Sequence, residues 1–170
     1  MKREGWGPAR ADVLPAGYTF APADLPDPGG LAARFGQAVR RAGGRPGSGW
    51  LYAGLHGEYS METGLIDLHW HMLAAGSCLA AVESLRGRRA YRHARAVQVT
   101  RRPLTDLPRP LTYIRQSWLP ARDRRLDNPP RERMPEPAHS LVLLWMDRFP
   151  VRSFELMIGL RVIGGRLVRR

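Results

Sequence analysis

A chain of 170 residues is long enough for one domain with a substantial core, and its 27 Lys and Arg against 15 Asp and Glu give a formal net charge of +12. Such a charge favours nucleic acid as a partner, because phosphate backbones attract basic proteins through a salt-dependent electrostatic term. The single cysteine excludes a disulfide framework, and without a signal peptide or an apolar run that could span a bilayer we expect a cytoplasmic protein.

The first elements that the chain predicts are a short strand and a helix. Residues 1–30 are rich in Gly and Pro, and only Gly17–Phe20 reads as a strand there. Residues 31–42 place apolar side chains at helical spacing, and the pair Gly43-Gly44 ends the helix.

Two strands joined by a short loop come next. Residues 50–59 are rich in aromatics, and residues 66–73 read Ile-Asp-Leu-His-Trp-His-Met-Leu. The polar segment 60–64 between them ends in Gly, which suits a hairpin loop. The sequence therefore predicts a β-hairpin over residues 50–74.

The hairpin carries a group of ionisable residues that can share one face. Side chains of residues i and i+2 point the same way on a strand, so His69 and His71 stand side by side. If His56 lies opposite His69, then Glu58 lies opposite Asp67 and all five side chains share that face, whereas a slip of one residue would remove His56 and Glu58. Adjacent imidazoles are a beginning of a metal site. The alternative is a solvated hairpin face of alternating polarity.

The middle of the chain continues in mixed order. Residues 78–86 predict a second helix that Gly87 ends, and residues 91–100 predict a further strand. Asp106 can cap a helix that runs through about Trp118. This order predicts an α+β fold, with an antiparallel sheet and helices packed on one of its faces.

The C-terminal part is expected to hold short elements only. Leu141–Met146 and Phe154–Leu160 predict two short apolar helices, and residues 162–168 predict a small hairpin. Because each is too short to stand alone, we expect them to pack on the main domain. Three segments follow: a main domain over 1–119, a linker rich in Pro and Arg over 120–137, and a small helical appendage over 138–170.

The order of these motifs resembles the HUH endonucleases, which include rolling-circle replication initiators, relaxases and related transposases. His69-Trp70-His71 matches the metal motif of that family, and Tyr113, in Leu-Thr-Tyr-Ile-Arg-Gln-Ser-Trp, matches the nucleophile motif. The resemblance covers roughly residues 15–120. The family usually has a lysine shortly after the tyrosine, where this chain has Arg115 and Gln116.

The resemblance implies a metal-dependent reaction on DNA. His69 and His71 would bind Mg²⁺ or Mn²⁺ with a polar third ligand, for which His56 and Glu58 are the candidates. The cation would polarise the scissile phosphate. Tyr113 would attack that phosphate and become joined to the 5′ end of the cut strand.

The partners implied are single-stranded DNA and other replication or mobilisation proteins. The residues expected to contact DNA are Arg101, Arg102, Arg115 and Trp118. Arginine binds phosphate in bidentate fashion and stacks on bases, and tryptophan stacks on unpaired bases.

Four alternatives remain open at this stage. Tyr91 is a rival nucleophile, and Tyr113 can also be a buried aromatic of its helix. The chain can be a non-catalytic, nucleic-acid-binding relative of the same family. It can also be a metal-dependent hydrolase of another kind.

Overall fold

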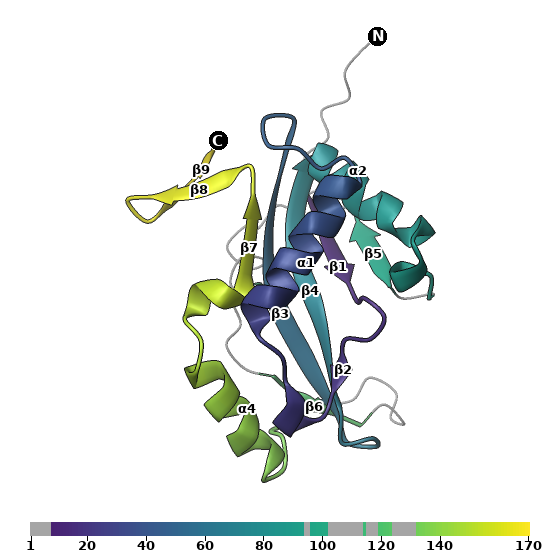
Figure 1. Ribbon diagram of the computed structural model, residues 1–170, viewed down its shortest axis with the longest axis vertical. Helices are drawn as coiled ribbons and strands as arrows, with labels where there is room; N and C mark the ends of the chain where they lie inside the picture. The colour runs from purple at the N-terminus through teal and green to yellow at the C-terminus, as the bar shows by residue number, and fades with distance from the viewer. Residues whose placement is uncertain (1–7, 94–95, 102–113, 115–118, 124–131) are drawn as a thin grey trace.

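A computed structural model of the protein describes residues 8–93, 96–101, 114, 119–123 and 132–170 (Figure 1). It contains a sheet of seven strands in the order β5-β1-β4-β3-β6, with β2 added to β4 and β7 added to β3. All strand pairs of this sheet are antiparallel except the short β3–β6 pair. The strands are β1 Ala9–Val13, β2 Thr19–Phe20, β3 Gly49–Ser60, β4 Ile66–Gly76, β5 Val97–Thr100, β6 Ala121–Arg122 and β7 Glu155–Ile158.

Helices α1 (Pro28–Arg41) and α2 (Ser77–Ser84) lie across one face of this sheet (Figure 1). This arrangement confirms the predicted α+β class. A third helix, α4 (Ala138–Asp147), lies near one end of the sheet, and no helix of the described residues is long and apolar enough to cross a membrane. The described residues also form short 3-10 turns: η1 Pro22–Asp24, η2 Leu85–Gly87, η3 Arg89–Tyr91 and η4 Val151–Phe154.

Helix α1 begins and packs for local reasons that its sequence contains. The Asp27 carboxylate accepts hydrogen bonds from the backbone N–H groups of Gly29 and Gly30 at 2.9 and 3.0 Å, which caps the first turn. The buried side of the helix includes Phe35, whose ring stacks on Trp70 with centroids 5.3 Å apart. This contact anchors α1 over the middle of β4 and directs Trp70 to the helix-covered face.

The hairpin of β3 and β4 has the register that brings the ionisable residues together. His56 pairs with His69 and Glu58 pairs with Asp67. Residues opposite each other in an antiparallel pair share a face, so the ionisable residues of both strands lie on the face away from Trp70. The predicted hairpin is confirmed, and of the two registers left open it has the one that places these residues on one face.

Strand β1 was not predicted, although it decides what lies beside the histidines. Its residues alternate between buried and half-buried, and it pairs with β4 on one side and β5 on the other. Asp12 lies opposite His71 in the first of these pairs. The strand predicted over 91–100 is shorter than expected, because β5 begins at Val97 and Tyr91 belongs to η3.

The C-terminal part agrees with the predictions in one helix and one hairpin. Helix α4 contains the predicted Leu141–Met146, and β8 (Leu160–Ile163) pairs with β9 (Arg166–Arg169) as a separate two-stranded sheet. The helix predicted over Phe154–Leu160 is wrong, because β7 occupies that stretch and pairs with β3. A short apolar run can form a helix or a strand, and here the hydrogen bonds that the edge of β3 offers to its backbone favour the strand.

Candidate functional site

Four ionisable side chains from three adjacent strands meet on the sheet face away from α1 and α2. We call Asp12, His56, His69 and His71 the histidine cluster. His56 and His71 are buried, with 5% and 7% of their surface exposed, and His69 is half-buried. The ring centroids of His69 and His71 are 4.6 Å apart, and those of His56 and His71 are 4.5 Å apart. Three imidazoles and a carboxylate, all side chains of types that can bind metals, thus lie close together on this face.

The hydrogen bonds of His69 and His71 determine which nitrogens carry lone pairs. Nδ1 of His69 lies 3.2 Å from the backbone oxygen of Asp67, which can only accept, so this nitrogen carries the proton. Nδ1 of His71 donates to the Asp12 carboxylate. The two Nε2 atoms are 2.9 Å apart: if both rings are neutral, both atoms carry lone pairs, and if His71 is protonated, its Nε2 donates to that of His69. Two lone pairs at this distance repel, so a proton or a metal cation is needed between them.

The pKa values of His69 and Asp12, the two partners of His71, are both shifted by burial and by neighbouring groups. Burial, together with the neighbouring His71, lowers the pKa of His69 to about 3, so that His69 is neutral at physiological pH. Burial alone would raise the pKa of Asp12, but the hydrogen bond and charge of His71 and the charge of Arg10 outweigh it, and the net shift is downward. Asp12 is therefore an ionised acceptor that orients the imidazole of His71, as carboxylates do for metal-binding histidines.

His56 is held by the segment that covers this face. Its Nε2 lies 3.0 Å from the backbone oxygen of Ile114 and donates to it, which leaves Nδ1 as the nitrogen with a lone pair. Gly54, opposite His71, makes this approach possible, because a Cβ atom there would lie 2.0 Å from the Ile114 oxygen. The glycine thus allows the backbone at Ile114 to lie directly on the sheet beside His56.

The carboxylates of the hairpin have other partners. Glu58, a predicted metal ligand, pairs with Arg122 at 3.0 Å, and Asp67 accepts a hydrogen bond from Thr19 at 2.6 Å. Within the described ranges, no three or more His, Cys, Asp or Glu side chains are arranged as a ready metal-binding group. His69 and His71 are therefore the two candidate ligands whose ring nitrogens face each other, and the third ligand stays a prediction.

Sequence reasoning missed Asp12. The signal was the alternation of small apolar and polar residues over Ala9–Val13, which is typical of a half-buried strand but was masked by the surrounding Gly and Pro. Even with the strand recognised, its position beside β4 depends on long-range pairing.

The other predicted site residues are placed in part. Tyr113, Arg102, Arg115 and Trp118 lie outside the described residues, so their roles stay predictions. Arg101 pairs with Glu83 of α2 at 2.6 Å, which directs its guanidinium towards that helix.

Tyr91, the alternative nucleophile, lies in the core. It belongs to the same buried cluster as Trp70, on the helix-covered side of the sheet. Burial and the neighbouring Tyr18 raise its pKa to about 12, which keeps the hydroxyl protonated. This placement argues against Tyr91 as the group that acts beside the histidines.

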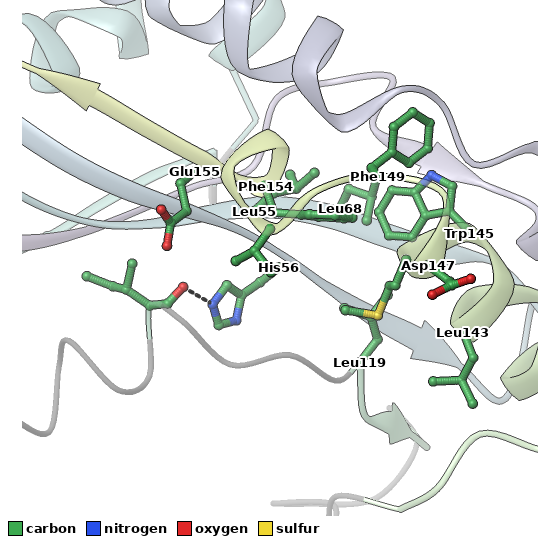
Figure 2. Close-up of a pocket in the computed structure, with 13 residues that line it drawn as sticks. Leu55, His56, Leu68, Leu119, Leu143, Trp145, Asp147, Phe149, Phe154 and Glu155 are labelled. Atoms are coloured by element: carbon green, nitrogen blue, oxygen red, sulfur yellow. Dashed lines mark hydrogen bonds between the residues drawn. The ribbon is translucent and has the colours of Figure 1, made fainter. Parts of the chain in front are cut away.

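An apolar cavity of about 350 Å³ opens next to His56 (Figure 2). Strand β7 pairs with β3 over Leu51–Gly54 and β6 pairs with it at Tyr59–Ser60, and the cavity borders the stretch between them. Its aromatic wall consists of Trp145, Phe149 and Phe154. The Trp145 ring is fixed by a 2.8 Å hydrogen bond to the Pro26 oxygen and by an edge-on contact with Phe154 at 5.0 Å. The cavity is therefore a preformed apolar recess at the border of the histidine cluster.

No protein-family model, curated protein or solved structure matches this chain in sequence or fold comparisons.

Proposed function

We propose that this protein is a metal-dependent enzyme that nicks single-stranded DNA and transfers the cut strand, of the replication-initiator or mobilisation kind. The observation that carries the proposal is the facing pair of Nε2 atoms of His69 and His71, 2.9 Å apart, each oriented by an acceptor at Nδ1. Adjacent ligands of an octahedral cation at about 2.1 Å are separated by about 3 Å, so the pair fits Mg²⁺ or Mn²⁺ in spacing.

Each residue of the histidine cluster has a separate part in this proposal. His69 and His71 would hold the cation through Nε2, and Asp12 would orient His71 and raise its basicity. His56 or Glu58 would be the third ligand, the former through Nδ1 while its Nε2 donates to the Ile114 oxygen, and the latter after leaving Arg122. When bound, a divalent cation would neutralise charge that builds on the phosphoryl oxygens.

Tyr113 is the proposed nucleophile. Its neighbour Ile114 lies on the sheet face of the histidines, where its backbone oxygen accepts from His56. In the reaction the tyrosine oxygen would bond to phosphorus as the bond from phosphorus to the 3′ oxygen breaks. The phenol proton would pass overall to the leaving 3′ oxygen, giving a free 3′ hydroxyl and a 5′ phosphotyrosine.

Charge and the cavity support a single-stranded substrate. The net charge of +12 favours binding of a phosphate backbone. Unpaired bases stack on aromatic side chains, and the cavity beside His56 has an aromatic wall of suitable chemistry. A duplex keeps its bases stacked inside and has no group for such a recess.

The test is incubation of the full chain with 5′- and 3′-labelled single-stranded DNA and Mn²⁺, followed by a denaturing protein gel. We expect a covalent adduct that carries only the label on the 3′ side of the nick, and none with EDTA. Tyr113→Phe removes the nucleophilic oxygen alone, so it should bind DNA as the parent does and form no adduct. Tyr91→Phe is the matched control and should form the adduct.

The same experiment separates the catalytic proposal from a non-catalytic relative. Binding of DNA by parent and variants with no cut and no adduct under any divalent cation would favour the binding protein. An adduct that persists in Tyr113→Phe would assign the nucleophile elsewhere.

A further inference from the structure

The β8–β9 hairpin, together with Arg170 that follows it, forms a basic arm that projects from the body of the molecule (Figure 1). We call Leu160–Arg170 the arm. Only Leu160, at its base, is buried, and Val162, Ile163, Leu167 and Val168 are 38–56% exposed. From Leu156 to Arg170 the sequence has four arginines and no acidic residue. A projecting two-stranded ribbon with this composition is marginally stable alone and is suited to a partner surface.

The direction of the arm is built into the fold. Gly159 has φ +68°, and a Cβ atom there would lie 2.5 Å from the Gly49 oxygen, so the chain can turn sharply out of β7 only with glycine at this position. Gly164 and Gly165 both have positive φ, which closes the arm with a tight two-residue turn. Leu160 packs with Tyr52, Leu73 and Ile114, so the arm leaves the body beside the face that carries the histidine cluster.

Arginine and apolar side chains share both faces of the arm. The register pairs Leu160 with Arg169 and Val162 with Leu167, and these four residues share one face. Arg161 pairs with Val168 and Ile163 pairs with Arg166 on the other face. Each face therefore combines positive charge with apolar surface.

We propose that the arm binds in the major groove of a B-form DNA duplex, an activity separate from single-strand nicking. The major groove is about 12 Å wide and admits a two-stranded ribbon, and a four-residue strand spans about 13 Å. Because each face of the ribbon carries both arginine and apolar side chains, either face can be turned to the base edges. The arginines reach phosphates or guanine edges, and the apolar side chains meet thymine methyl groups.

Other partners fit the two faces less well. A membrane surface requires the apolar side chains to gather on one face, whereas here they are divided between two. A second copy of the arm would bring like charges together on either face. Duplex RNA has a major groove too deep and narrow for side chains to read. The distribution of charge therefore favours B-form DNA.

The test is titration of the full chain into a labelled blunt DNA duplex of mixed sequence, in EDTA, at several salt concentrations. Arg161, Arg166 and Arg169 are replaced together by Ala, with Arg41, Arg45 and Arg89 replaced together as a control that removes the same charge from exposed positions outside the arm. The arm variant should bind at least about tenfold more weakly, and its slope of log K against log salt should fall by up to about 2.7, at 0.9 per lost phosphate contact. The control variant should lose distinctly less affinity for the duplex, and its slope of log K against log salt should change distinctly less.

Several results would overturn the proposal. Equal binding by the arm variant and the control would mean that the duplex contacts only general positive charge. RNA duplex bound as tightly as DNA, with the same dependence on the arm, would exclude the groove. The arm would be assigned to self-association if the parent sediments as a dimer, Ile163→Ser with Leu167→Ser dissociates that dimer, and DNA binding is unchanged. Because the assay contains no metal and no cleavage step, its outcome is independent of the nicking proposal.

Discussion

The imidazoles of His69 and His71 face each other through Nε2 atoms 2.9 Å apart, while their Nδ1 atoms are engaged by the Asp67 backbone oxygen and by Asp12. At this distance the two rings hold either a proton or a bound cation between them, so the pair is a candidate cation site. It also makes the site testable without knowledge of a substrate.

The first prediction concerns metal binding. Mn²⁺ should raise the melting temperature of the protein, because a ligand bound only by the folded state stabilises it by about 2.7 kcal/mol at 100 times its Kd. His69→Ala together with His71→Ala should abolish this shift. The measurement is thermal unfolding with and without Mn²⁺, and His139→Ala, on α4, is the control that should keep the shift. A double variant that responds to Mn²⁺ as the parent does would remove the pair from consideration.

The second prediction concerns Asp12. Asp12→Asn keeps the size of the side chain and can still accept from His71, but it removes the charge that makes the ring a better ligand. We expect Mn²⁺ affinity to fall by about 10–100-fold, as is usual for the orienting carboxylates of metal-binding histidines. Calorimetric titration measures the change, and Asp24→Asn, at an exposed carboxylate of η1, should have none. Equal affinity in the two variants would show that Asp12 does not act on the site.

The third prediction concerns pH. The pKa of His69 is lowered to about 3 in the folded protein, whereas an unfolded histidine has a pKa of about 6.5. Between these values the unfolded chain binds the extra proton, so stability is complete above pH about 6.5 and falls with decreasing pH, by at most about 1.4 kcal/mol per unit from this group. Urea unfolding in EDTA at a series of pH values measures the slope.

His69→Asn supplies the comparison for that series. It should be less sensitive to pH between about 6.5 and 4.5, where few carboxylates titrate. Identical slopes in parent and variant would mean that His69 titrates as an exposed histidine does.

The fourth prediction concerns Gly54. Gly54→Ala places a methyl group where the Ile114 oxygen lies, so the backbone at Ile114 must move and the hydrogen bond from His56 is lost. We expect a loss of about 1–3 kcal/mol in the free energy of unfolding, the usual cost of overpacking. Chemical denaturation measures it. Gly87→Ala meets nothing within 4 Å and should change stability little. A neutral Gly54→Ala would mean that this contact contributes nothing to the fold.

Much of the site's framework follows from local pattern. The short polar loop and the strand patterns on both sides of it predict the β3–β4 hairpin, whereas its register was left open by the sequence, and the structure places His56 opposite His69. Helix α1 is predictable because its apolar spacing and its terminal glycines are properties of adjacent residues. The hairpin and the helix are both predictable because each depends on residues that are close together in the sequence.

Tertiary structure alone decided the rest. Asp12 reaches His71 because β1 pairs with β4 on one side and with β5 on the other. The five residues of β1 contain no local pattern that predicts those two neighbours. The apolar run after Phe154 became strand β7 because the edge of β3 offered it hydrogen bonds, although its pattern also suited a helix. Local sequence sets what a segment prefers, whereas the contacts between strands far apart in the chain decide which face, which neighbour and therefore which chemistry it acquires.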